Sequence, residues 1–315
     1  MEEIHGPDIQ FVDRGQCPLC GTDSSSNHIA FDELPVVRCS SCGFLYSGRL
    51  MCEKDLSDYY SQGFGSERHR QGQLVNAKIN AWAVGRLLPV EQIRSFLDVG
   101  TGYGYLLREM QLRYDIQGKG VELSEQESRY GKDELGLDIT NGSLSEPGLA
   151  ARSFDLVACF EVIEHIPNPV AFMKALIGYV KPGGYLVVMT DNFECQVARD
   201  LGPSFPKWIP HSHISHFGPK TLESLFDDQG IRIVGRLSYT PWELLARLQH
   251  YRLRGIQLTP REAFDLSDAL SSEMHGHYHL FALRRLVNSL WARLTARNDL
   301  GGALMYLVGK VDSSR

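Results

Sequence analysis

Three glycines at alternate positions, Gly100, Gly102 and Gly104, follow a short apolar run. Glycine tolerates positive φ and lets a ligand approach the backbone closely, so a turn of this composition between a strand and a helix suits a nucleotide-like ligand. Glu122 follows Gly102 at a distance typical of a side chain that binds ribose hydroxyls. The loop is not a dinucleotide loop, because the position that would need the last glycine holds Tyr105.

Four cysteines form two C-x-x-C-G pairs, Cys17 with Cys20 and Cys39 with Cys42. Two thiolates on one tight turn can hold an ion, and four complete the tetrahedral shell that suits Zn(II). A site with four protein ligands has no open position, so we predict structural zinc in a ribbon. Free thiols, or iron in the same ligand set, are the alternatives.

Acid–base chemistry is predicted from two further segments. Glu161 directly follows an apolar run, at a predicted strand end. His211, His213 and His216 lie in a Pro- and aromatic-rich segment, and an imidazole there can deprotonate a hydroxyl group. We select Glu161, His213 and His216 as catalytic candidates. The alternatives for the histidines are a second metal site, or a structural segment that positions the next helix.

Apolar strand patterns and amphipathic helix patterns alternate from residue 95 onward. This alternation predicts a parallel sheet with helices on both faces, and ligands beyond the carboxyl ends of the strands. The strands are predicted at 95–100, 117–122, 137–141, 154–160, 184–191 and 231–238, and the helices at 103–114, 125–135, 168–180 and 219–229.

The pattern Asp98-x-Gly100-x-Gly-x-Gly104 resembles the first motif of class I S-adenosylmethionine (SAM) methyltransferases. The segments 154–169 and 180–186 resemble the fourth and fifth segments of that family, especially the small-molecule branch that includes the ubiquinone O-methyltransferases. The resemblance covers about residues 80–240. A ribbon before such a domain also resembles bacterial methyltransferases of natural-product and surface-sugar pathways.

The resemblance implies an α/β fold. Its expected parts are a Rossmann-like seven-stranded sheet with helices on both faces, a small N-terminal zinc ribbon, and a C-terminal helical insertion before the last strand. It also implies SAM as cofactor, with the methionine part near the Gly loop, the ribose on Glu122 and the methionine amine or the substrate near Glu161. The implied cofactor-binding residues are Asp98, Gly100, Thr101, Gly102, Gly104, Glu122, Leu123, Ser143, Leu144 and Glu161.

Composition excludes several partners. A net charge of −6 and a pI near 6.0 argue against a basic surface for nucleic acid or anionic membrane. The acidic, polar N-terminus predicts no secretory signal, and no apolar run reaches the length of a membrane span. Cysteines without a signal peptide indicate a reducing compartment, so we expect a cytoplasmic protein.

The predicted domains follow from these patterns. They are a ribbon at 1–52, a helical linker or lid at 53–92, a SAM-binding domain at 93–240, a helical insertion at 241–300, and a final strand with its tail at 301–315. Tyr59, Tyr60 and Phe64 are lid candidates. The insertion, with helices at 241–254, 260–275 and 278–297, is predicted either to line the substrate pocket or to form a homodimer contact.

We therefore expect in-line transfer of the SAM methyl group to a small-molecule acceptor. A hydroxyl acceptor is favoured over nitrogen or carbon, in a natural-product or sugar-type metabolite. The Asn/Asp-Pro-Pro-Tyr/Phe motif typical of base-amine and amide methylation is absent after residue 160. The alternatives are an RNA methyltransferase that uses the ribbon to hold RNA, and a catalytically silent SAM-binding scaffold.

Overall fold

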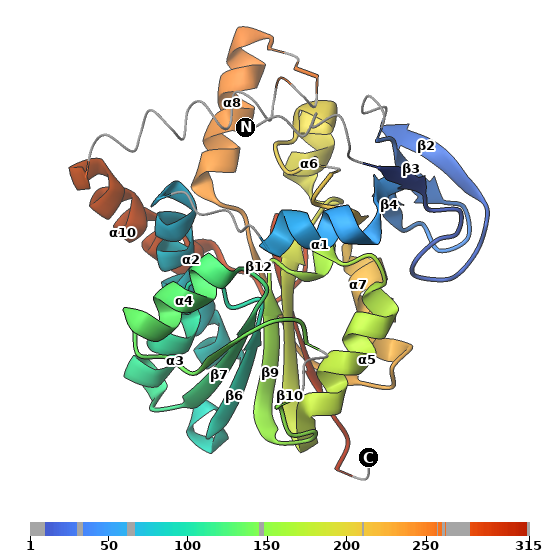
Figure 1. The fold of residues 1–315 in the computed structure, drawn as a ribbon. Coiled ribbons are helices and arrows are strands. Elements are labelled where there is room, and N and C mark those ends of the chain that lie inside the picture. The colour runs from blue at the N-terminus through green and yellow to red at the C-terminus, as the bar shows by residue number, and fades with distance from the viewer. Residues whose placement is uncertain are drawn as a thin grey trace.

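The chain folds around a seven-stranded sheet (Figure 1). The structure is a computed structural model, and it describes residues 10–29, 34–61, 67–144, 148–209, 211–256, 258–259, 262 and 278–313. The strand order is β12-β13-β10-β9-β6-β7-β8. The strands are β6 (Ser95–Val99), β7 (Gln117–Glu122), β8 (Ile139–Asn141), β9 (Phe154–Phe160), β10 (Val180–Asp191), β12 (Arg232–Tyr239) and β13 (Leu304–Lys310).

The predicted strands and the predicted fold class are confirmed. Strands β8, β7, β6, β9 and β10 pair in parallel, whereas β13 enters antiparallel between β10 and β12. Neighbouring residues of one strand pack on opposite faces: Leu156 contacts one core cluster and Val157 the other. A sheet covered on both faces needs such continuous apolar strands, which is why the sequence shows runs rather than alternation.

Helices cover both faces of the sheet. On one face lie α2 (Glu67–Leu87) and α3 (Tyr105–Tyr114), and on the other α5 (Pro169–Tyr179) and α7 (Pro219–Asp227) (Figure 1). Helix α4 (Glu125–Asp133) contacts β7 and β8. Helix α4 begins where the Ser124 hydroxyl accepts the Glu127 N–H, and α5 begins where the Asn168 side chain accepts the Ala171 N–H. Such N-caps satisfy backbone donors that the first turn leaves unpaired.

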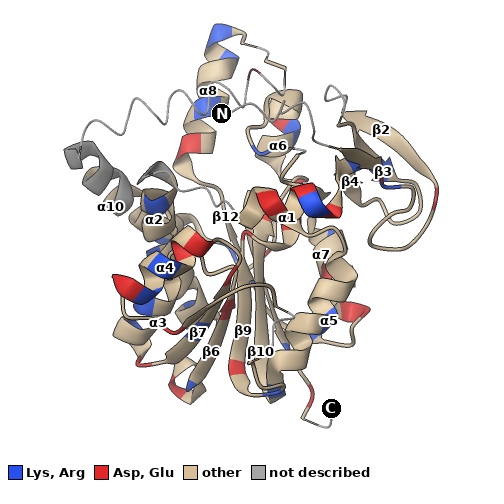
Figure 2. Cartoon of the chain, viewed as in Figure 1, with Lys and Arg blue, Asp and Glu red and all other residues tan. Residues whose placement is uncertain are grey.

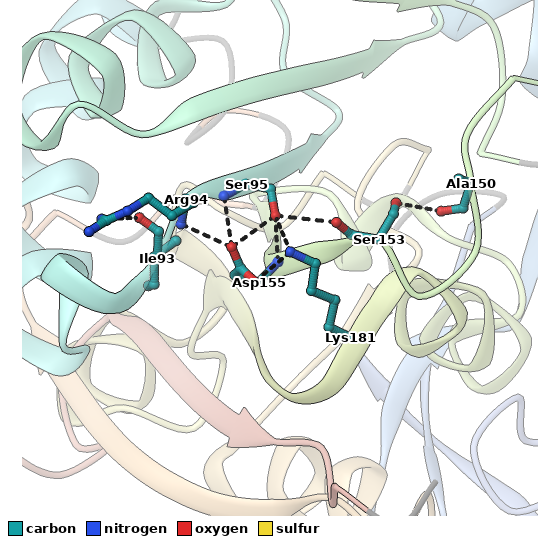
Figure 3. A network of polar contacts seen from close by, with 7 residues as sticks. All are labelled: Ile93, Arg94, Ser95, Ala150, Ser153, Asp155 and Lys181. Carbon is teal, nitrogen blue, oxygen red and sulfur yellow. Dashed lines mark hydrogen bonds and ion pairs between the residues drawn. The ribbon is translucent and has the colours of Figure 1, made fainter.

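A polar network fixes the amino ends of β6 and β9, far from the carboxyl ends where a ligand is expected (Figure 3). The Asp155 carboxylate accepts the backbone N–H groups of Arg94 and Ser95 and pairs with the Lys181 ammonium at 2.7 Å. Although burial opposes ionisation, these donors hold the pKa of Asp155 below its ordinary value. Asp155 is therefore a structural residue.

The ribbon forms a small sheet of its own. Strands β2 (Ser25–Ile29), β3 (Val36–Cys39) and β4 (Leu45–Ser47) are joined by β11 (Ser215–His216), which comes from the segment after β10. Strand β1 (Phe11–Asp13) pairs with β5 (Arg49–Met51). Strands β2 and β3 pair antiparallel, with Ser25 opposite Cys39.

The remaining elements flank the sheet. Helix α1 (Glu53–Ser61) follows β5, α6 (Gln196–Leu201) follows β10, and α8 (Trp242–Arg254) and α10 (Tyr278–Thr295) precede the last strand. The short 3-10 helices are η1 (Val90–Gln92), η2 (Ile163–His165) and η3 (Gly202–Ser204). The predicted helix at 260–275 falls outside the described residues, except for residue 262. No helix in the described part of the chain is long and apolar enough to cross a membrane.

Candidate active site

A cavity of about 660 Å³ lies at the carboxyl ends of β6, β7 and β9. The α/β topology places ligands at this edge of the sheet. The cavity brings together residues predicted from separate stretches of sequence. Of the predicted cofactor-binding residues, those that line it are Asp98, Gly100, Thr101, Gly102, Glu122, Leu123, Ser143, Leu144 and Glu161, and Gly104 instead forms the N-cap of α3.

The Gly loop is built for glycine. Gly100 has φ +72° and Gly102 has φ +55°, in the left-handed region that other residues rarely adopt. A Cβ on Gly100 would lie 2.4 Å from Val162 Cγ2, and one on Gly102 would lie 2.3 Å from Gln73 Oε1. Both positions therefore exclude a side chain.

Gln73 of α2 hydrogen-bonds to the Gly loop. Its Oε1 accepts the Tyr103 N–H at 3.0 Å, and its Nε2 donates to Glu127 Oε2 at 3.0 Å. One amide thus ties the loop to α4. No sequence pattern indicates Gln73, because it lies about a helix and a strand before the loop, in a segment without a motif.

Glu122 contacts the same loop from β7. Its Oε2 accepts the Gly102 N–H at 2.8 Å and its Oε1 accepts the Ser124 N–H at 2.9 Å. Each carboxylate oxygen keeps a second lone pair, so two hydroxyl groups can still be bound. Burial raises the pKa of Glu122 above its ordinary value.

Asp98 lies at the floor of the cavity. It is buried, and its Oδ2 accepts the Thr101 hydroxyl at 2.8 Å. Burial, with a smaller contribution from the Glu122 charge, raises the pKa of Asp98 to about 7. A cationic ligand beside this carboxyl group would favour its ionised form.

Glu161 stands at the end of β9 with φ +55°, an unusual conformation for a residue with a side chain. Strained backbone of this kind clusters at functional sites. Asn76 Nδ2 donates to Glu161 Oε2 at 3.1 Å, and Lys207 Nζ lies 3.3 Å from Oε1. Lys207 also pairs with the buried Asp191 at 3.1 Å. Although burial opposes its charge, these carboxylates raise the pKa of Lys207.

His165 also lines the cavity, although it is not among the site residues predicted from sequence. Its Nδ1 lies 2.9 Å from the Ser212 carbonyl oxygen, which also accepts the Tyr60 hydroxyl at 2.9 Å. A carbonyl only accepts, so Nδ1 carries the proton and Nε2 keeps the lone pair. Burial lowers the pKa of His165 to about 4.

The three predicted loop histidines do not form one cluster of ligand atoms. The ring of His213 lies against that of His165, with centroids 4.8 Å apart, but His213 does not line the cavity. His216 lies in β11, buried against Phe193 and Trp208, and it is likewise absent from the lining. The His211 ring contacts Tyr59.

Ligand atoms of a different trio, Glu164, His165 and His213, lie within 4.8 Å of one another. Glu164 is buried and accepts the Thr190 hydroxyl at 2.9 Å, and burial raises its pKa to about 8. A second metal site here would therefore combine His213 with Glu164 and His165, rather than with His211 and His216. Among the predicted lid residues, Tyr60 lines the cavity, whereas Phe64 lies outside the described residues.

The four ribbon cysteines converge as predicted. Sγ–Sγ distances are 3.6 Å for Cys17–Cys42 and for Cys20–Cys39, and all four Sγ atoms lie within 4.8 Å of one another. Four sulfurs at the usual Zn–S distance would be roughly 3.8 Å apart, so the cluster fits Zn(II). The two knuckles match: after each, a glycine with φ +76° donates its N–H to the carbonyl of the first cysteine.

Comparisons with known proteins agree with this geometry. The family described as "Methyltransferase domain" matches residues 67–235. The ubiquinone biosynthesis O-methyltransferase of Xanthomonas axonopodis pv. citri is 32% identical over 167 residues, which cover 48% of this chain and 69% of that protein. The Brucella ovis protein of the same name is 31% identical over 163 residues, which cover 48% of this chain and 65% of that protein.

Solved structures share the fold at low identity. A SAM-dependent methyltransferase from Thermotoga maritima has a TM-score of 0.51 at 17% identity, over 80% of this chain and 98% of its own. A chain from the complex of a Haloferax volcanii methyltransferase activator with a methyltransferase has the same TM-score and identity, over 82% and 98%. These likenesses establish the fold and nothing finer.

Proposed function

This chain belongs to the methyltransferase-domain family and is a SAM-dependent methyltransferase, and from that premise we propose that it methylates a hydroxyl group of a small molecule. The observation that carries the proposal is a single cavity that runs from the Gly loop and Glu122 to Glu161, His165 and Tyr60. The first group suits the cofactor. The second group leaves space beside it for an acceptor.

The size of the cavity supports a small acceptor. Its volume of about 660 Å³ lies within the range of small-molecule sites, and α1 contributes Leu56, Ser57 and Tyr60 to its lining. The name of the Xanthomonas relative, an O-methyltransferase, favours oxygen as the methyl acceptor.

The charge of the lining supports an acceptor without phosphate groups. None of the lining residues in the described parts of the chain is Lys or Arg, and five are Asp or Glu. An anion would meet carboxylates there, whereas the cationic sulfonium of SAM is favoured. Lys207 stands behind Glu161, and the ion pairs with Glu161 and Asp191 offset its charge. A nucleoside diphosphate sugar therefore fits less well than a neutral or cationic metabolite.

SAM, when bound, supplies a methyl group activated by its sulfonium. We assign the ribose hydroxyls to Glu122 and the methionine part to Asp98 and the Gly loop. The acceptor hydroxyl then loses its proton as its oxygen forms the new bond to carbon. We infer that Glu161, or His165 through its Nε2, takes that proton, since both residues line the cavity. His213 and His216, predicted from sequence as bases, remain hypotheses, and the cavity geometry favours Glu161 and His165 over them.

We also propose structural Zn(II) on Cys17, Cys20, Cys39 and Cys42, supported by the convergence of their thiols. The RNA alternative would need a basic face. On the described chain, Lys and Arg are interspersed with Asp and Glu on α1, α4 and α8 (Figure 2), which does not favour it.

Calorimetry with SAM tests the cofactor assignment. Glu122→Ala removes a charged acceptor of hydrogen bonds, worth about 1.5–3 kcal/mol, so SAM affinity should fall at least tenfold. The matched control is Glu125→Ala, an exposed carboxylate of α4 paired with Arg129, which should leave affinity unchanged. Equal affinities of the Glu122 variant and the unmodified protein would refute the ribose assignment.

A methyl-transfer screen tests the acceptor class. S-adenosylhomocysteine release is measured with phenols, other alcohols, amines and their phosphorylated counterparts. We expect turnover with hydroxylated, phosphate-free compounds. Preferred turnover of a phosphorylated member of a matched pair would contradict the assignment, and turnover of RNA alone would establish the rival function.

A further inference from the structure

The segment 164–167, named here the acceptor wall, forms one side of the cavity: His165, Ile166 and Pro167 all line it. Two of its carbonyl groups accept hydrogen bonds from residues that do not line the cavity. The Glu164 carbonyl accepts the Ile214 N–H at 2.8 Å, and the Ile166 carbonyl accepts the Ser215 hydroxyl at 3.0 Å. The side chain of His165 is held the same way, by the carbonyl of Ser212.

The residues that hydrogen-bond to the acceptor wall belong to β11 or adjoin it. Strand β11 in turn pairs with the ribbon. Ser215 pairs with Tyr46 and His216 with Leu45 in β4, and the Ser47 N–H donates to the Ile214 carbonyl at 3.1 Å. The ring of Phe44 packs on that of Phe217 with centroids 4.9 Å apart.

Arg14 joins the two layers directly. Its Nη1 donates to the Ile214 carbonyl at 2.6 Å, and its Nη2 donates to the carbonyl of Pro167 in the acceptor wall. The guanidinium lies over the Tyr46 ring, 5.6 Å from the centroid. Burial lowers the pKa of Arg14 to about 10, so the group is still charged at neutral pH. A planar guanidinium with several fixed donors suits such bridging, and lysine cannot reproduce it.

The cofactor half of the cavity is held by other residues. The Gly loop hydrogen-bonds to Gln73 and Glu122, which belong to α2 and β7. The ribbon hydrogen bonds described above end on the acceptor wall, on β11 or on Ile214, which adjoins β11. The Gly loop and the acceptor wall are thus held by hydrogen bonds from different elements.

We propose that the ribbon positions the acceptor wall, with Arg14 as its main positioning residue, and that SAM binding does not depend on it. This inference rests on the proposed function only in taking segment 164–167 to lie beside the methyl acceptor. The ribbon would then govern where the acceptor and His165 lie, through hydrogen bonds and without touching the reacting atoms.

Hydrogen–deuterium exchange on the full chain tests this support without a known acceptor. Arg14→Gln removes the charged donors, so amides of 163–168 and 212–217 should exchange at least tenfold faster. Exchange in the Gly loop and SAM affinity by calorimetry should stay within twofold. Arg49→Gln is the matched control, since Arg49 is a ribbon arginine whose ion pair with Asp13 stays within the ribbon.

A second arm removes the metal with a chelator and restores it with Zn(II). Exchange at 163–168 and 212–217 should rise and then recover, while the Gly loop stays unchanged. Should Arg14→Gln not fold, Arg14→Lys serves in its place, with a smaller rise in exchange. With an acceptor from the screen, Arg14→Gln should raise the acceptor KM and lower kcat while the KM for SAM holds.

Two results would overturn the proposal: unchanged exchange at 163–168 in the Arg14 variant, or a tenfold loss of SAM affinity in it. Loss of SAM binding in Glu122→Ala is measured separately. A failure of the cofactor assignment is therefore distinguishable from a failure of the ribbon proposal.

Discussion

The histidines show how the surroundings of a side chain, rather than its type, decide its chemistry. His213 and His216 are three positions apart in sequence, yet His213 lies beside the cavity wall and His216 lies in β11 among aromatic rings. His165, 48 residues before His213, has its ring against it. The contact with the Ser212 carbonyl favours a proton on His165 Nδ1, and this contact supports the proposal of His165 as a base.

His216 should lower the free energy of unfolding of the protein in acid. Burial lowers its pKa to about 3, whereas in the unfolded chain the pKa is about 6.5. Below that pH the unfolded chain binds a proton that the folded protein does not, so the folded state loses stability as the pH falls. His216→Phe removes this proton-binding site. The free energy of unfolding of the variant, relative to that of the unmodified protein, should therefore rise by roughly 2 kcal/mol between about pH 7.5 and about pH 5.

Denaturant melts at the two pH values measure this gain. His250→Phe, which removes a histidine from the exposed face of α8, is the control variant. A difference between the unmodified protein and His216→Phe that is the same at both pH values would show that His216 titrates normally. Unchanged methyl transfer in the variant would also remove His216 as a base.

Residues whose partners are near in sequence were predictable, and the others were not. The Gly loop is a local turn between a strand and a helix, and Glu122 ends the next strand, so pattern and spacing identify both. Gln73 acts on Tyr103, and His165 is fixed by Ser212. Those contacts arise only when distant segments pack, and no local pattern encodes them.

At the scale of elements, some parts of the ribbon can be predicted from sequence and others cannot. Each knuckle is a self-contained turn with its own cysteines and glycine, so its geometry follows from the sequence. Strand β11 has two residues and no apolar alternation of its own. It exists because β4 offers unpaired backbone groups beside it, which is a tertiary cause. The predicted helix ends were within a few residues because caps are local.

The ribbon should carry about one zinc per chain, measured by elemental analysis of the purified protein. Cys39→Ser removes one ligand and should lower the zinc content severalfold and destabilise the ribbon, since metal binding and folding are coupled. Cys52→Ser is the control, because Cys52 lies outside the cluster. Iron in place of zinc would support the alternative metal, and a metal-free protein with an ordered ribbon would refute the site.

At the scale of the whole molecule, the parallel pairing of the sheet and its helical covering followed from the alternation of strands and helices. The helical insertion before β13 was also expected, whereas its packing was not. Helix α10 presents exposed apolar side chains at a 4-3-4 spacing, the spacing of a seam between two helices. They are Leu283, Val287, Leu290 and Leu294, with exposed fractions of 57%, 37%, 50% and 82%.

We expect this seam to pair with α10 of a second copy, since a helix with the same spacing is its natural complement. Light scattering after size exclusion should show a dimer across a dilution series, and Leu290→Glu should convert it to a monomer. Leu112→Glu, at an exposed position on α3, should leave the dimer intact. An unmodified protein that is monomeric throughout would contradict the pairing.

The pairing of β11 with β4 also affects the order in which parts of the ribbon fold during synthesis. Arg14 and Ile214 are separated by 200 positions, so their contact closes a very long loop. Contacts of such separation form late, because the entropy of closing the loop must be overcome first. The cysteine knuckles can assemble as soon as their cysteines leave the ribosome. The ribbon sheet gains its fourth strand only after most of the chain has emerged, so the first domain to begin folding is among the last to finish.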